Sequence, residues 1–146
     1  MDAAPLRVTV HIDGASRGNP GAAAAGVVVA DAADGVVIHE SGVFLGHATN
    51  NVAEYRGLLA GLEAAAALQA GEVELFSDSQ LLVRQMTGEY RVRNAGLKPL
   101  HARARQLAGG FARCRFRHIP REENTRADAL ANQALNLRRN VADAEQ

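Results

Sequence analysis

The sequence predicts one α/β domain built on a mixed β-sheet, with the element order βββαβααβα. Three observations support this prediction. Residues 6–46 contain three strand-like apolar runs joined by short turns, which is typical of an antiparallel meander. Apolar residues at spacings of three and four then indicate helices, of which the clearest covers residues 51–69. Two further strand-like runs, 72–77 and 112–119, alternate with the helices.

The first three strands are expected over residues 6–13, 22–30 and 36–46. The first is an apolar run that ends at Asp13. The segment 14–21 is rich in glycine and proline, so we expect it to interrupt regular structure. It lacks the Gly-Lys-Ser/Thr sequence of a phosphate-binding Walker loop.

The helix over residues 51–69 carries an acidic residue, Glu54, whose environment is unusual. Gly57 and Gly61 share its side of the helix, and each mid-helix glycine costs about 1 kcal/mol relative to alanine. We therefore expect the helix backbone to lie close to the sheet, with Glu54 pointing at the sheet. The alternative is an exposed Glu54 paired with Arg56.

The second half of the chain predicts a short helix at 79–86, a basic loop at 90–96 and a helix at 97–107. The strand at 112–119 places arginines on one face and apolar residues on the other, so it is expected at a sheet edge. The last helix is expected from Glu122 to Leu137. Residues 1–138 are expected to form the single domain, followed by a frayed tail, 139–146.

Composition favours a cytoplasmic protein. The chain has 146 residues and a single cysteine, which excludes an internal disulfide. No apolar stretch is long enough to span a membrane, and the start does not resemble a secretory signal. Residues 1–80 hold three arginines against ten acids, whereas residues 81–146 hold thirteen basic residues against six acids. This asymmetry suits a polyanionic partner, although lopsided charge also arises by chance.

Four carboxylates stand where folding alone explains them poorly: Asp13, Glu54, Asp78 and Asp128. Asp13 and Asp78 each follow a strand, and adjacent strand ends line ligand crevices in α/β sheets. If all four converge, their repulsion requires cations between them, and hard cations such as Mg²⁺ accept such ligands. Two such ions can hold a phosphodiester for attack by water. Individually, the two strand-end aspartates could be turn or cap residues, and Asp128 could be a solvated helical acid near Arg126.

Four segments, each centred on one of these acids, together resemble the type 1 ribonuclease H family. They are HIDGASRGNPG, TNNVAEYRGLLAGL, SDSQLLVRQM and HIPREENTRADALANQA, and they follow the family's order from Leu6 to Asn136. The resemblance implies the ribonuclease H-like fold, a five-stranded sheet of order 3-2-1-4-5 with helices on both faces. It also implies endonucleolytic hydrolysis of the RNA strand of RNA/DNA hybrids, giving 5′-phosphate and 3′-hydroxyl ends.

The resemblance assigns metal-binding roles to the four acids. Asp13 would bridge two Mg²⁺ ions, with Glu54 and Asp78 on one ion and Asp128 on the other. Mn²⁺ is a plausible substitute because its ligand preferences are similar. No small-molecule cofactor is implied, and nothing in the sequence demands more than a monomer.

The resemblance also assigns substrate contacts. Gly14, Asn19, Asn50 and Gln80 would read successive 2′-hydroxyls, which distinguish RNA from DNA. Thr49 and Asn51 would contact the DNA strand, although helix capping is an alternative for Asn50 and Asn51. His118 would assist product release, as a mobile histidine does in many members. Arg121 is the rival for that role, and a packing role is the alternative for His118.

The chain departs from longer family members after the SDSQ helix. They insert an extra helix and a tryptophan-bearing basic loop, the handle, whereas TGEYRVRNAGLKPL runs straight across and the chain has no tryptophan. We expect Arg91, Arg93, Asn94 and Lys98 to replace this handle in part. Two other classes stay open at this point: another nuclease on the same fold, and a hybrid- or dsRNA-binding module without activity.

Overall fold

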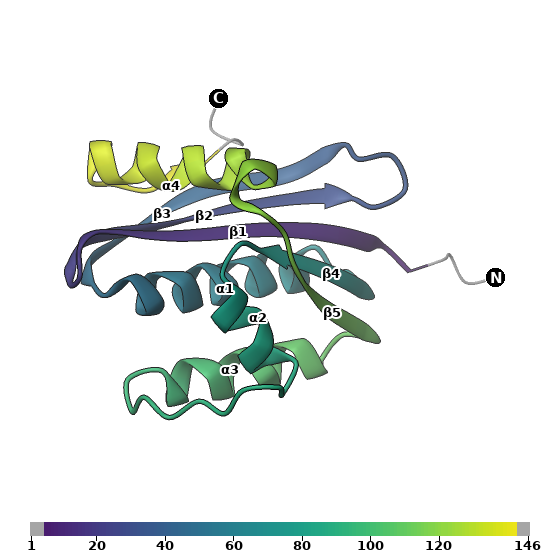
Figure 1. Ribbon diagram of the computed structural model, residues 1–146. Helices are drawn as coiled ribbons and strands as arrows, with labels where there is room; N and C mark the ends of the chain where they lie inside the picture. The colour runs from purple at the N-terminus through teal and green to yellow at the C-terminus, as the bar shows by residue number, and fades with distance from the viewer. Residues whose placement is uncertain (1–4, 143–146) are drawn as a thin grey trace.

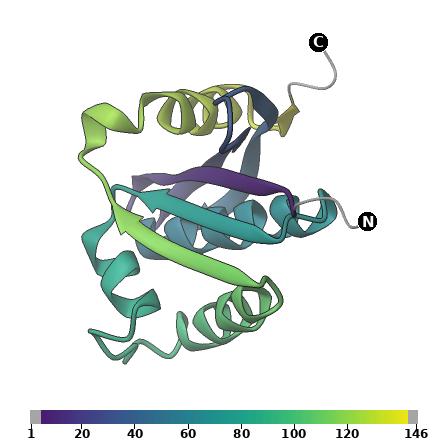
Figure 2. The same cartoon turned by 90° about the vertical axis from the view of Figure 1, so that its right-hand side faces the viewer.

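The computed structural model describes residues 5–142, which form one sheet between two layers of helices (Figure 1). The elements are β1 (Arg7–Gly18), β2 (Gly21–Asp31), β3 (Val37–Ala48), α1 (Asn50–Ala67), β4 (Glu72–Ser77), α2 (Gln80–Met86), α3 (Lys98–Gly109), β5 (Arg113–His118), a 3₁₀ turn η1 (Arg121–Glu123), α4 (Thr125–Leu137) and β6 (Val141–Ala142). α4 covers one side of the sheet, over β1, β2 and β3, and the other helices lie on the opposite side (Figures 1 and 2).

The strand order is β5-β4-β1-β2-β3-β6. β1, β2 and β3 form the expected antiparallel meander, and β4 and β5 continue the sheet in parallel. The predicted order 3-2-1-4-5 is therefore confirmed, and β6 is an additional sixth strand. Val141 and Ala142 pair with β3, and Val141 packs on the apolar clusters under α4. This corrects the predicted frayed tail for those two residues, while residues 143–146 lie outside the described part.

β1 is longer than predicted. It does not stop at Asp13 but continues to Gly18, and its pairing with β2 closes at Gly18 and Gly21. Glycine at position 14 serves packing rather than a turn, because a Cβ there would lie 2.4 Å from the backbone of Ala53 in α1. A glycine inside a strand commonly marks such a close approach. The prediction that segment 14–21 interrupts regular structure is therefore wrong up to Gly18.

The expected close approach of α1 to the sheet is confirmed. A Cβ on Gly57 would lie 3.1 Å from the carbonyl oxygen of Asp13, and one on Gly61 would lie 2.8 Å from Ile12 Cγ2. Glu54 is 5% exposed and points away from water, so the alternative of an exposed Glu54 is excluded. The apolar core fills the space between this side of the sheet and the helices.

α4 approaches the opposite face equally closely, at Gly26. A Cβ on Gly26 would lie 1.9 Å from the carbonyl oxygen of Ala127.

We expect Gly26→Ala to lower the free energy of unfolding by about 2 kcal/mol, because α4 must move off the sheet. Gly109→Ala, at the open end of α3, is the matched control and should be neutral or stabilising. Urea unfolding of both variants measures this, and equal stabilities would contradict the packing described.

α4 begins three residues later than predicted, because residues 121–123 form η1 instead. A helix that began at Glu122 would place Asp128 in its second turn, whereas Asp128 lies in the first turn of α4. The edge position predicted for the strand at 112–119 is confirmed, since β5 ends the sheet. Within residues 5–142, no helix combines the length and apolar character needed to cross a membrane.

Candidate functional site

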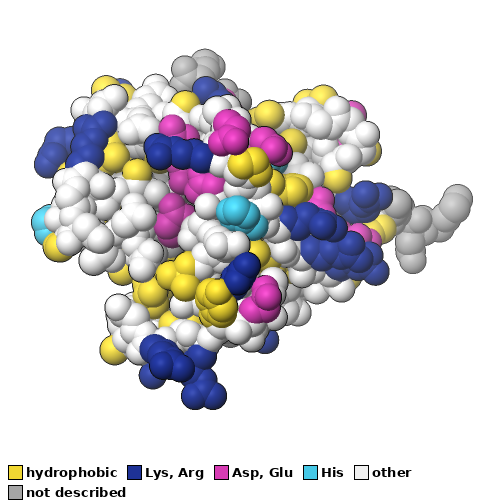
Figure 3. Space-filling view, viewed as in Figure 1, with side chains coloured by type: hydrophobic (Ala, Val, Ile, Leu, Met, Phe, Trp, Pro, Cys, Tyr) yellow, Lys and Arg dark blue, Asp and Glu magenta, His cyan; other side chains and the backbone are white. Residues whose placement is uncertain are grey.

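A cavity of about 410 Å³ lies where β1 passes the carboxyl end of β4 and the start of α1. It brings together all four of the acids predicted from the sequence. The lining residues are Asp13, Gly14, Ala15, Ser16, Asn50, Glu54, Asp78, Arg121 and Asp128. Figure 3 shows acidic side chains gathered in a hollow on this face of the molecule.

Three of the carboxylates form a tight cluster. One oxygen from each of Asp13, Glu54 and Asp78 lies within 4.8 Å of the others. The backbone N–H of Gly14 donates at 3.0 Å both to Asp13 Oδ1 and to Glu54 Oε1, which fixes these two carboxylates relative to each other. The second oxygen, Glu54 Oε2, is buried and has no hydrogen-bond partner within the described residues.

This crowding changes the acidity of the cluster. Burial, followed by repulsion from Glu54, Asp78 and Asp128, raises the pKa of Asp13 to about 9. Burial is also the main reason that the pKa of Glu54 rises to about 7, against the lowering effect of the Gly14 N–H. Without cations, the cluster therefore favours bound protons over full ionisation at neutral pH.

The donor set fits hard divalent cations. All the ligand candidates are carboxylate oxygens, which Mg²⁺ and Mn²⁺ prefer, and the cluster offers no thiolate or imidazole. The unpartnered Glu54 Oε2 supports this fit, because a buried carboxylate oxygen without a partner is costly unless a cation or another donor satisfies it.

Asp128 joins the cluster from α4, on the opposite side of the sheet from α1. Its backbone N–H donates to the carbonyl of Asn124 at 3.1 Å. The side chain of Asn124 is buried, and its Nδ2 donates at 2.8 Å to the carbonyl of Ile12, the residue before Asp13. Asn124 thus ties the helix that bears Asp128 to the strand that bears Asp13. Sequence reasoning missed this residue, because it placed Asn124 inside a helix predicted to begin at Glu122.

Of the four residues predicted to read 2′-hydroxyls, two line the cavity and two are not among its lining residues. Gly14 and Asn50 line it, and Asn19 Oδ1 accepts the backbone N–H of Asn50 at 3.1 Å. Gln80 is exposed at the start of α2, two residues after Asp78. Asn19 and Asn50 therefore meet from the β1–β2 hairpin and α1, which supports their assignment to one surface.

Thr49 caps the start of α1. Its side chain accepts the backbone N–H of Val52 at 3.2 Å, so Asn50 and Asn51 are not needed for that role. Asn51 is exposed in the first turn. Sequence reasoning did not single out Ala15 and Ser16, which also line the cavity.

His118 and Arg121 occupy different positions relative to the cavity. His118 ends β5, pairs in register with Ser77 and is exposed, which argues against a buried packing role. Arg121 lines the cavity, with Nη2 4.0 Å from Asp128 Oδ1, and its side chain is 79% exposed. The release role assigned to either residue stays a prediction.

The segment 87–97 between α2 and α3 contains no helix, in keeping with the absence of a handle. Val92 and Leu97 are buried and anchor it to the core. Arg91 and Arg93, on either side of Val92, are exposed. Asn94 is exposed too, and its Oδ1 accepts the N–H of Gly96 at 2.7 Å.

A β5-β4-β1-β2-β3 sheet with acids gathered at this point defines a ribonuclease H-like protein. A family model described as reverse transcriptase-like matches residues 11–134. The crystal structure of RNase H1 from the archaeon Halobacterium salinarum is 48% identical, with a TM-score of 0.86 over 89% of this chain and 98% of that one. The chain belongs to the type 1 ribonuclease H family.

Two further solved structures are similar. The N-terminal RNase H domain of rv2228c from Mycobacterium tuberculosis is 46% identical, with a TM-score of 0.88 over 90% of this chain and 95% of that one. LC11-RNase H1, solved in complex with an RNA/DNA hybrid, is 41% identical, with a TM-score of 0.84 over 89% of this chain and 97% of that one.

The chain spans less than two thirds of the length of two of the curated relatives it matches. It spans 64% of the length of Ribonuclease HI from Halobacterium salinarum, at 49% identity over 88% of this chain. It spans 38% of the length of the bifunctional protein Rv2228c from Mycobacterium tuberculosis, at 45% identity over 96% of this chain.

Proposed function

We propose that the protein is an endoribonuclease that cleaves the RNA strand of RNA/DNA hybrids by metal-dependent hydrolysis, leaving 5′-phosphate and 3′-hydroxyl ends. The observation that carries the proposal is the convergence of Asp13, Glu54 and Asp78 within 4.8 Å, beside Asp128, in a chain of this family. The substrate follows from family membership and from the hybrid bound to the related LC11 enzyme.

Each acid has a distinct part in this proposal. Asp13, at the centre, would hold two Mg²⁺ ions together with Glu54 and Asp78 on one side and Asp128 on the other. When bound, the ions activate the attacking water and stabilise the leaving 3′-oxygen. The Gly14 N–H holds the Asp13 and Glu54 carboxylates in place for this role. Mn²⁺ substitutes for Mg²⁺ because it accepts the same oxygen ligands.

The surface around Asn19, Asn50 and Gln80 selects RNA. An amide side chain both donates and accepts, so it matches a 2′-hydroxyl, which does the same. Gly14 contributes its backbone, and Thr49 and Asn51 contact the DNA strand. His118 or Arg121 assists product release. The proposal includes a monomeric, cytoplasmic enzyme.

The substrate class is tested by comparing four labelled duplexes of one sequence: hybrid, dsDNA, dsRNA and a DNA duplex with one ribonucleotide. We expect cleavage of the RNA strand of the hybrid and intact dsDNA. Efficient dsDNA cleavage would favour another nuclease on this fold. Tight hybrid binding without cleavage in Mg²⁺ would favour an inactive binding module.

The basic segment between α2 and α3 is proposed to hold the hybrid in place of a handle. Arg91→Ala with Arg93→Ala should weaken hybrid binding and reduce the salt slope of log Kd by about 1 for each phosphate that the protein no longer neutralises. Arg103→Ala, on the exposed side of α3, is the single-charge control. Fluorescence anisotropy at several salt concentrations measures the slope, and an unchanged slope in the double variant would remove the segment from the interface.

A further inference from the structure

A row of arginines lies on the sheet face that α4 leaves uncovered. In register across β1, β4 and β5, the three rows are Arg7–Glu72–Arg113, Thr9–Glu74–Arg115 and His11–Phe76–Arg117. α4 contacts β1, β2 and β3, so the β4 and β5 part of this face is open (Figure 2). We name Arg7, Arg113, Arg115 and Arg117 the sheet-face arginines.

This face leads directly to the acid cluster. Side chains alternate along a strand, so positions 7, 9 and 11 of β1 share a face with Asp13. Likewise, positions 72, 74 and 76 share a face with Asp78, just beyond β4. Rows on one face are about 6.6 Å apart, because a strand rises about 3.3 Å per residue. The Arg117 row is therefore the neighbour of the Asp13 and Asp78 row.

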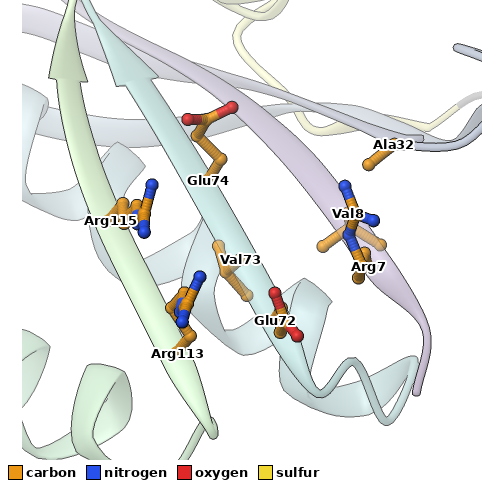
Figure 4. Close-up of a pocket in the computed structure, with 8 residues that line it drawn as sticks. All are labelled: Arg7, Val8, Ala32, Glu72, Val73, Glu74, Arg113 and Arg115. Carbon is orange, nitrogen blue, oxygen red and sulfur yellow. The ribbon is translucent and has the colours of Figure 1, made fainter. Parts of the chain in front are cut away.

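Three of the four sheet-face arginines have no carboxylate partner among the described residues. Arg117 is paired with Glu74. No carboxylate oxygen in residues 5–142 lies within 4.0 Å of the guanidinium nitrogens of Arg7, Arg113 or Arg115. These three border a cavity of about 320 Å³, shown in Figure 4 with Glu72 and Glu74 on the strand between them. Four arginines face two glutamates, so the patch is positive.

The arrangement favours one kind of anion. Glu72 and Glu74 occupy the middle strand, so a polyanion is repelled there and is attracted along β5, where the arginines repeat every second residue. A single linear row of arginines at about 6.6 Å spacing provides for one phosphate backbone, and the acidic middle strand provides no second row for the other backbone of a duplex. Figure 3 shows basic side chains over β4 and β5 on the same visible face as the acidic hollow.

We propose that the sheet-face arginines bind a single-stranded extension of the nucleic acid whose hybrid portion occupies the cavity. The phosphates run along β5 past Arg117, Arg115 and Arg113. The stacked pair His11 and Phe76, with ring centroids 4.7 Å apart, lies in the same row as Arg117, beside the row of Asp13 and Asp78. The proposal rests on the proposed function for the identity of the strand, but its test is a binding measurement that needs no cleavage.

The alternative role of these arginines is protection of the β5 edge against pairing with another sheet, a common use of charged side chains. That role affects aggregation and does not depend on an overhang. The two roles therefore separate in one binding experiment.

The experiment compares a blunt hybrid with the same hybrid carrying a ten-nucleotide single-stranded DNA or RNA extension at each end in turn. Kd is measured by fluorescence anisotropy in chelator, where we expect the strands to stay intact. For the wild-type protein, one extension should lower Kd several-fold. Arg113→Ala with Arg115→Ala should abolish that advantage and lower the salt slope for the extended hybrid by about 1.4, or about 0.7 for each single-strand phosphate.

Matched variants control for charge and folding. Arg103→Ala with Arg139→Ala removes the same charge from exposed positions elsewhere and should keep the advantage. If thermal unfolding shows that the alanine variant is unfolded, Arg113→Gln with Arg115→Gln replaces it and keeps most of each side chain.

Three results would overturn the proposal. They are equal Kd values for blunt and extended hybrids, equal loss of the advantage in the control variant, and displacement of the extended hybrid by polyglutamate as readily as by a single-stranded oligonucleotide. The last would mark a general site for acidic chains. Failure of the protein to cleave any hybrid would count against the proposed function and leave the binding result to be judged separately.

Discussion

Replacing Asp13 by Asn is expected to lower the rate of hybrid cleavage about 1,000-fold or more. Asp13 lies at the centre of the cluster, against Glu54, Asp78 and Asp128, and Asn removes its charge while keeping its shape. Lewis-acid stabilisation of the reacting phosphate contributes several kcal/mol, and about 1.4 kcal/mol corresponds to a factor of ten in rate. Single-turnover cleavage of a labelled hybrid in Mg²⁺ measures the loss.

The control for this variant is Glu63→Gln, an exposed acid on the same helix as Glu54. It should cleave at the wild-type rate. Circular dichroism should show that Asp13→Asn is folded, and anisotropy in chelator should show that it still binds hybrid. Cleavage by folded Asp13→Asn within tenfold of wild type would remove Asp13 from the centre of the mechanism.

The second large effect is on the stability of the metal-free protein. The folded-state pKa of Asp13 is raised to about 9 from an ordinary value of 3.8, so the folded protein binds this proton more tightly than the unfolded chain. The stabilisation that comes from the proton on Asp13 is therefore complete below about pH 4 and is lost as the pH rises through about 9. Glu54, raised to about 7, acts in the same direction. Urea unfolding in chelator should show stability falling over this range.

Two changes should remove that pH dependence in part. Asp13→Asn cannot ionise, so at pH 8 it should be more stable than the metal-free wild type by about 1–2 kcal/mol. Mg²⁺ at 100 times its Kd should stabilise the wild type by about 2.7 kcal/mol and the variant by much less. A wild-type free energy of unfolding that changes with neither pH nor Mg²⁺ would show that the carboxylates do not repel one another as described.

Strand and helix identity could be predicted because the apolar periods are strong in this chain. The meander, the close approach of Gly57 and Gly61 to the sheet, and the burial of Glu54 all followed from local pattern. The ends of the strands and helices were harder to predict from the sequence. Gly14 has the signature of a turn, yet it lies inside β1 because α1 passes over it, and nothing local encodes that contact.

The start of α4 and the pairing of Val141 and Ala142 show the same limit. η1 replaces the first predicted turn of the helix, and β6 forms because Val141 packs under α4. Both depend on tertiary contacts rather than on helix or strand propensity.

The four acids of the site were found because a carboxylate beside apolar positions is conspicuous. Asn124 was not, because its role is a hydrogen bond to Ile12, 112 residues earlier in the chain. The alternation of Arg113, Arg115 and Arg117 predicted a solvent-exposed strand face. The sequence does not reveal the parallel register that places this face beside Asp78, because register is set between strands.

The most direct test of the central claim is cleavage of an end-labelled RNA/DNA hybrid by metal-stripped protein, before and after Mg²⁺ is restored, with identification of the product ends. We expect no cleavage in chelator and, with Mg²⁺, RNA fragments with 5′-phosphate and 3′-hydroxyl ends. Equal cleavage without metal, or 2′,3′-cyclic phosphate ends formed by attack of the RNA's own hydroxyl, would contradict an acid cluster that works by holding cations.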